Sequence, residues 1–283
     1  MDKYAKYVFV YPAAIVLCMM MVFPFGYTAY LSAFDWFVAG PAPRFVGLEN
    51  YVRLLSDSRF LSATWNTIVY TVVAVTLEVV LGIMIALLVE KPFRGRAIMR
   101  TAFMLPMVAT PVAIALVWLL MFDPASGILN YLLVSVGLPP SAWVNNAALA
   151  IPALIAVDVW QWTPLVTLIV LGGLTALPEE PYEAALIDGA NRWQSFIYLT
   201  LPLLWPYIVV AALFRGIDAL KTFDSIYVIT KGGPGFASET LNLYIYSTAF
   251  DYLHMGYSSA MLVVFFAITL VLSLLLIRVR RQS

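Results

Sequence analysis

Charged and polar side chains interrupt several apolar stretches of this 283-residue chain, and these are the residues most able to do chemistry. Carboxylates and amides exchange hydrogen bonds with the hydroxyls of a solute, and the face of an indole ring stacks on an apolar ring face. These side chains are therefore candidates to line a path for a polyhydroxylated solute. They are Glu78, Asp158, Trp160, Gln161, Trp162, Arg215, Asp218, Lys221 and Asp224.

Four of these charges share one stretch and follow one another at steps of three: Arg215, Asp218, Lys221 and Asp224. Residues three apart are neighbours on a helix surface, so the spacing predicts one broad charged stripe with pairs Arg215–Asp218 and Lys221–Asp224. Two interpretations remain open. The stripe either lines a polar path or contacts another subunit, or it forms structural ion pairs that hold helices together.

Other kinds of site lack the residues they need. The chain has one cysteine, Cys18, and one histidine, His254, too few for a disulfide or a usual zinc site, and we expect no catalytic site, no metal and no bound cofactor. A phosphate-binding G-x-x-x-x-G-K-[ST] motif is absent from the sequence, so ATP is not hydrolysed here by that route. The zero net charge argues against nucleic-acid binding.

The composition places the chain in the lipid bilayer. It is 63% hydrophobic and only 11% charged, with a mean hydropathy of +0.90, whereas soluble domains carry about 25% charged residues. A helix needs roughly 20 apolar residues to cross the hydrocarbon core. Six runs of this length predict an all-α membrane protein with one transmembrane domain over residues 1–283. They span residues 7–31, 67–89, 101–122, 149–174, 204–228 and 258–277.

Prolines lie inside several of these runs, and we expect each run to stay unbroken because neighbouring groups can satisfy the freed carbonyls. The first run resembles a secretory signal because Lys3 and Lys6 precede it, but it is too long for one, and we interpret it as a retained anchor.

Lysine and arginine favour the cytoplasmic side, which gives the orientation. With the N-terminus inside, ten basic residues are inside and four are outside, so we expect both termini in the cytoplasm. The inner residues are Lys3, Lys6, Lys91, Arg94, Arg96, Arg100, Arg192, Arg278, Arg280 and Arg281, and the outer ones are Arg44, Arg53, Arg59 and Lys231.

The inner loop 175–203, between the fourth and fifth runs, contains a short predicted helix. Pro181 suits the first turn, Glu179, Glu180 and Glu183 place negative charge at its positive end, and Gly189 suits its end. A helix of about eight residues is marginal alone, so it must pack on something. Either it packs on the inner ends of the spans or it fits the cleft of a partner. A second helical stretch, 191–200, follows, and Pro202 is expected to mark a turn into the fifth span.

This loop resembles the signature of permease subunits of binding-protein-dependent ATP-binding-cassette importers. The matching residues are Glu183, Ala184, Ala185, Gly189, and Leu199-Thr200-Leu201-Pro202, where the family usually has Ile in place of Leu199. Further segments resemble the carbohydrate branch, of the maltose and glycerol 3-phosphate type. They are Phe45–Tyr51, Asn66-Thr67, Arg100 with Leu105-Pro106, Asp188-Gly189-Ala190, Phe223-Asp224, Gly232–Gly235 and Glu239–Leu241.

The resemblance implies a multi-pass inner-membrane subunit of a bacterial importer. Its partners would be a second permease, two cytoplasmic ATPase subunits that bind ATP and Mg, and an extracytoplasmic solute-binding protein. The short helix would then be the coupling helix that contacts an ATPase subunit. The residues assigned to this role are Glu183, Ala184, Ala185, Leu186, Asp188, Gly189 and Ala190.

Two rival functions are weighed against this one. A secondary transporter driven by an ion gradient would use Glu78 and Asp158 as coupling groups, but it leaves the helical inner loop without a role. An intramembrane enzyme would need a nucleophile with a base, and His254 lies near a span end.

Overall fold

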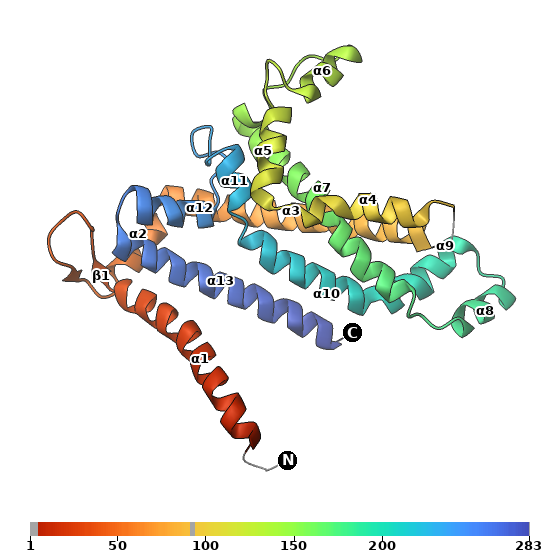
Figure 1. Ribbon diagram of the computed structural model, residues 1–283, viewed down its shortest axis with the longest axis horizontal. Coiled ribbons are helices and arrows are strands. Elements are labelled where there is room, and N and C mark those ends of the chain that lie inside the picture. The colour runs from red at the N-terminus through yellow and green to blue at the C-terminus, as the bar shows by residue number, and fades with distance from the viewer. Residues whose placement is uncertain (1–4, 91–93, 283) are drawn as a thin grey trace. The chain divides into compact units, whose positions relative to one another are not determined.

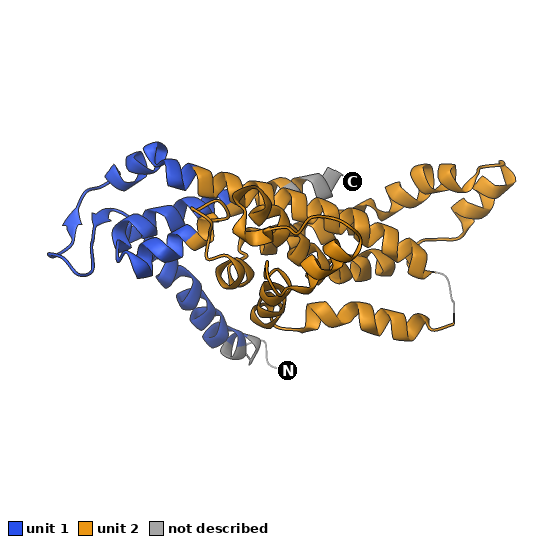
Figure 2. Cartoon of the chain, turned by 90° about the horizontal axis from the view of Figure 1, so that it is seen from above, with its two compact units in different colours: residues 1–61, 244–268 blue, residues 62–243, 269–283 orange. Residues whose placement is uncertain are grey.

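The computed structural model describes residues 5–90 and 94–282, so Lys3 and Lys91, two of the residues used for the orientation, lie outside it. The chain divides into two compact units, residues 1–61 with 244–268 and residues 62–243 with 269–283 (Figure 2). The first unit combines the N-terminal segment with a segment near the C-terminus, and the second combines the middle of the chain with its last residues. Each unit is described by itself.

Five helical stretches of the described chain are long and apolar enough to cross a membrane (Figure 1). They belong to α1 (Ala5–Leu31), α3 (Ser58–Glu90), α7 (Ala147–Leu174), α10 (Leu201–Leu220) with the turns before it, and α13 (Met255–Gln282). Helix α7 stays continuous through Pro152 and Pro164, as predicted. The shorter helices include α6 (Ile128–Ser135), η1 (Trp143–Asn145), α12 (Leu241–Tyr246) and η3 (Ser247–Asp251).

The third predicted span is broken, and the expectation of an unbroken run was wrong. Helix α4 (Arg96–Val108) and helix α5 (Pro111–Met121) are bent by 96° relative to one another, so a sixth span exists only if this pair is one. A residue before proline is driven out of the helical region, and Thr110 is extended, with φ −65° and ψ 140°. Pro111 then starts α5, because a first-turn residue needs no N–H partner.

The fifth predicted span also breaks, although no proline lies at the break. Helix α10 ends at Leu220 and helix α11 (Asp224–Ile229) begins four residues later, so the four charges do not lie on one helix. The predicted turn at Pro202 was wrong as well. Helix α9 (Arg192–Ser195) and a π-helical turn, η2 (Phe196–Thr200), run directly into α10, where Pro202 occupies the first turn.

In the first unit, a short ribbon of β1 (Phe34–Asp35) and β2 (Arg44–Phe45) precedes α2 (Glu49–Ser56). Asp57 joins the two chain segments of this unit, because its Oδ2 accepts hydrogen bonds from the hydroxyls of Tyr244 at 2.8 Å and Tyr257 at 2.6 Å. Burial raises the pKa of the Asp57 carboxyl, but these hydrogen bonds outweigh it and hold the pKa below its usual value. Asp57 is therefore a charged acceptor at neutral pH.

In the second unit, α7 is the central helix and is buried along much of its length. One apolar cluster forms where Leu154 and Val157 of α7 pack with Tyr70 of α3 and Ile226 of α11. A second cluster forms further along α7, around Val166 and Val170 with Leu204 of α10. Helices α3, α10 and α11 are thereby held against one helix, which positions the polar residues between them.

The contact of α7 with α10 depends on a small residue at position 173. A Cβ added at Gly173 would lie 2.6 Å from Cγ of Tyr207, whereas one added at the neighbouring Gly172 meets nothing within 4 Å. We expect Gly173→Ala to lower the free energy of unfolding by about 1–3 kcal/mol, because the core must shift to admit the methyl group. Thermal melting in detergent measures this, with Gly172→Ala as the matched control. Equal melting temperatures for the two variants would contradict the packing described here.

Candidate translocation site and coupling helix

Arg215 of α10 is the centre of a buried ion cluster that joins three helices. Its Nε donates to Oε2 of Glu78 on α3 at 2.7 Å, and its Nη2 donates to Oε1 of the same carboxylate at 3.0 Å. Nη2 also donates to Oδ2 of Asp158 on α7 at 2.8 Å, and Nη1 donates to Oδ2 of Asp218 at 2.7 Å. One guanidinium therefore contacts three carboxylates.

The cluster is almost completely removed from solvent. Arg215 and Glu78 are 0% exposed and Asp158 is 4% exposed, while the side chain of Asp218 is half exposed. The guanidinium carbon also lies 4.9 Å from the ring centroid of Trp162, a cation–π contact. Buried charges are tolerated only when they are paired and hydrogen-bonded, and the planar fork of arginine allows it to bind several carboxylates at once.

A polar cavity of about 220 Å³ lies beside this cluster, where the two broken spans expose their ends. Asp158, Gln161 and Asp218 form part of its wall, together with Pro111 at the start of α5 and the non-helical residues between α10 and α11. Gln161 is 2% exposed, and its Nε2 has no hydrogen-bond partner. The lining residues are Pro111, Asp158, Gln161, Trp162, Asp218, Lys221, Thr222, Phe223, Asp224 and Ser225.

The structure brings together most of the residues predicted for a polar path. Asp158, Gln161, Asp218, Lys221 and Asp224 all line the cavity.

Three predicted residues do not line the cavity: Glu78, Trp160 and Arg215. Glu78 lies behind the cavity as the partner of Arg215, and Trp160 lies on another face of α7, where its ring packs edge-on against Trp118 at 5.6 Å.

The structure shows ion pairs of the kind that the second interpretation expects, whereas a role of these charges in a solute path stays a prediction. The predicted Arg215–Asp218 pair is present at 2.7 Å, and Arg215 also forms ion pairs between helices. Within the described residues, no ion pair joins Lys221 to Asp224, because α10 ends between them. Four lining residues were not predicted: Pro111, Thr222, Phe223 and Ser225. The last three lie between or next to the charged residues Lys221 and Asp224, and this position is the signal that could have identified them.

The predicted inner helix is present as α8 (Glu180–Ile187), and it extends beyond the end of α7 (Figure 1). Gly189 follows it with φ +78°, a conformation that favours glycine, and the N–H of Ala190 bonds back to the carbonyl of Ala185 at 2.9 Å. Tyr182 anchors the helix by donating to Oγ1 of Thr200 at 3.1 Å. The helix is thus held at its first turn.

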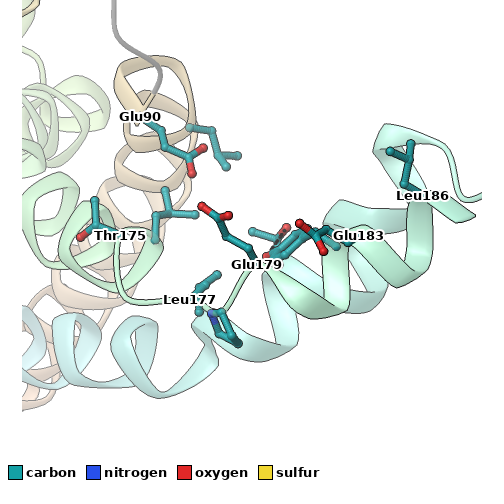
Figure 3. Close-up of a pocket in the computed structure, with 11 residues that line it drawn as sticks. Glu90, Thr175, Leu177, Glu179, Glu183 and Leu186 are labelled. Atoms are coloured by element: carbon teal, nitrogen blue, oxygen red, sulfur yellow. Dashed lines mark hydrogen bonds between the residues drawn. The ribbon is translucent and has the colours of Figure 1, made fainter.

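The far end of α8 is exposed and apolar. Leu186 is 76% exposed and Ile187 is 86% exposed. Behind the helix lies an open cleft of about 610 Å³, into which Glu90 of α3, Glu179 and Glu183 contribute carboxylates (Figure 3). The remaining residues assigned to this helix, Ala184, Ala185, Asp188, Gly189 and Ala190, lie on or just after it and have small or polar side chains.

Comparison with known proteins identifies the class. Residues 78–282 match the family described as "binding-protein-dependent transport system inner membrane component". The chain belongs to this family and is a permease subunit of an ATP-binding-cassette importer.

Curated relatives match along nearly the whole chain. A probable ABC transporter permease protein, y4oQ, of Sinorhizobium fredii is 41% identical over 267 residues, which cover 94% of this chain and 86% of that one. The trehalose/maltose transport system permease protein MalF of Thermococcus litoralis is 36% identical over 278 residues, covering 97% of this chain and 93% of that one.

A solved structure shares the fold. It is a chain of a bacterial ABC transporter involved in the import of the acidic polysaccharide alginate, with a TM-score of 0.85 and 21% identity. The match covers 99% of this chain and 96% of the other. This chain therefore shares its overall fold with that transporter chain.

Proposed function

We propose that this chain forms half of the path by which an ATP-driven importer carries a sugar or sugar-like solute across the bacterial inner membrane. Family membership supports the importer, and the relative that serves trehalose and maltose supports the solute class. We propose further that the chain crosses the membrane six times, with the bent pair α4 and α5 counted as one span, and that both termini lie in the cytoplasm.

The observation that carries the proposed coupling is helix α8. Eight residues do not form a stable helix alone in water, and two large apolar side chains at its end are exposed. A cleft on an ATPase subunit would cover Leu186 and Ile187. When the ATPase subunits close, the movement of α8 would reach α7 and α10 through its anchored first turn. The ATPase pair would supply ATP binding with Mg, and the other expected partners are a second permease and an extracytoplasmic solute-binding protein.

The cavity beside Arg215 is the proposed place where this subunit contacts the moving solute. Its carboxylates and the amide of Gln161 offer hydrogen bonds to hydroxyl groups, and Phe223 and Pro111 offer apolar surface. The gradient-driven rival is not favoured, because its two coupling groups, Glu78 and Asp158, are both hydrogen-bonded to Arg215.

Whole-cell uptake of radiolabelled neutral disaccharides tests this function. We expect uptake by cells that carry the complete system to stop when ATP is depleted and to continue when ion gradients are collapsed with ATP maintained. Asp158→Ala should reduce uptake, with protein level checked by immunoblot and Ser135→Ala on α6 as a control. Uptake that follows the ion gradient would contradict the importer, and full uptake by Asp158→Ala at a normal level would remove Asp158 from the path.

A further inference from the structure

The charges around the cavity are not balanced. Asp158, Asp218 and Asp224 line it directly, and Lys221 is the cation among the lining residues. Behind the wall, Arg215 faces Glu78 as well as Asp158 and Asp218. Three aspartates therefore line the cavity against one lysine, and the guanidinium of Arg215 is already paired behind its wall.

The arginine charge is not available to a solute in the cavity. Its Nε, Nη1 and Nη2 all donate to carboxylate oxygens at 3.0 Å or less, and one face of the guanidinium lies over the ring of Trp162. Asp158 and Asp218 line the cavity and Arg215 does not, so an anion in the cavity would lie next to these two carboxyl groups. The potential inside a low-dielectric wall is strengthened, so an excess of carboxylates there acts strongly on a solute.

Gln161 gives a second and independent indication of the ligand. Its amide is buried in the cavity wall, and Nε2, a donor, has no partner in the protein. A buried donor without a partner costs free energy unless a ligand or water accepts from it. A neutral hydroxyl oxygen can accept from Gln161 while its own hydrogen is donated to a carboxylate, whereas an anionic group can only accept.

We propose that this cavity selects by charge, admitting uncharged polyhydroxylated solutes and rejecting anionic ones such as uronates, sulfonates and phosphates. The proposal rests on the proposed function, in which the cavity lies on the solute path. Its volume of about 220 Å³ suits a group the size of a single sugar ring, since pockets for whole drug-sized ligands run from about 300 Å³ upward. Asp224 and Asp218 are the specificity-determining residues, and Lys221 opposes them.

The electrostatic potential in the cavity can be measured without knowing the solute. In the assembled, detergent-solubilised complex carrying Cys18→Ser, a reporter cysteine is placed in the cavity by Thr222→Cys. A matched reporter is placed at Ser135→Cys, an exposed position at the end of α6 in a stretch without charged residues. Each reporter is reacted with a cationic trimethylammonium-ethyl and an anionic sulfonato-ethyl methanethiosulfonate, and the ratio of the two rates is recorded.

The ratio of cationic to anionic rates is expected to be roughly tenfold higher at Thr222→Cys than at Ser135→Cys. Any effect of the surroundings on the reactivity of the thiol itself cancels in the ratio. Adding Asp224→Asn should lower the cavity ratio about threefold, and adding Lys221→Gln should raise it by a similar factor.

Two other outcomes would overturn the proposal in distinguishable ways. Equal ratios at the two reporters would contradict selection by charge but would not contradict the proposal that the cavity lies on the solute path. Modification at Ser135→Cys with none by either reagent at Thr222→Cys would show that water does not reach the cavity, and the proposed path would fail together with the selection.

Discussion

Replacement of Arg215 by methionine is expected to lower the stability of this subunit by about 3–5 kcal/mol. The substitution leaves Glu78 and Asp158 buried without their cation, at 0% and 4% exposure, and the side-chain hydrogen bonds that join α3, α7 and α10 are lost. Thermal melting of the purified complex and the amount of protein in the membrane both measure the effect. We expect little folded protein from this variant at the growth temperature.

A charge-balanced variant distinguishes the effect of unpaired buried charges from the effect of changed packing. Arg215→Met combined with Glu78→Gln and Asp158→Asn removes the unpaired charges while keeping similar volumes. Because replacing a whole buried ion cluster is often neutral, this triple variant should recover most of the melting temperature. The role of the cluster would be contradicted if Arg215→Met had the melting temperature of the wild type. It would also be contradicted if the triple variant had the same melting temperature as Arg215→Met alone.

Removing the apolar end of α8 is expected to separate the chain from its ATPase. Burial of a large aliphatic side chain contributes about 1.5–3 kcal/mol, so Leu186→Ser with Ile187→Ser should weaken the association at least tenfold. Both side chains are exposed in this subunit, so its own stability should not change. Recovery of the ATPase with a tagged permease, compared by immunoblot, measures the association.

The control for this variant is an equally exposed apolar residue away from α8. Leu55 on α2 is 78% exposed, and Leu55→Ser should leave ATPase recovery at the wild-type level. If the α8 variant retains wild-type recovery, or if Leu55→Ser loses as much, helix α8 is not the coupling element.

Helix α8 could be predicted from the sequence because local residues define both of its ends. Pro181, the glutamates of the first turn and Gly189 act within one or two turns, and the structure places the helix at Glu180–Ile187. The broken spans could not be predicted as well. Helix α7 continues through Pro152 and Pro164, whereas Pro111 separates α4 from α5. The presence of a proline therefore does not by itself predict whether a helix breaks.

The ion cluster shows the same limit for side chains. Spacing within one stretch predicted Arg215–Asp218 correctly, but it could not reveal Glu78, which lies 137 residues away in sequence. Spacing also could not predict that Trp162 contacts Arg215 whereas Trp160 packs on Trp118. Which face of α7 meets α10 depends on packing between helices. Local patterns identified the polar residues, and only tertiary structure shows which of them share a cavity.

The central claim, that this chain is one of two permease subunits of an ATP-driven importer, is tested most directly by identifying the proteins that accompany it in its native membrane. The tagged chain is solubilised gently, recovered with and without cross-linking, and its partners are identified by mass spectrometry. We expect an ATPase, a second permease and a solute-binding protein, and the binding protein would then serve to screen neutral and acidic sugars. Recovery of the chain alone, even after cross-linking, would contradict the account.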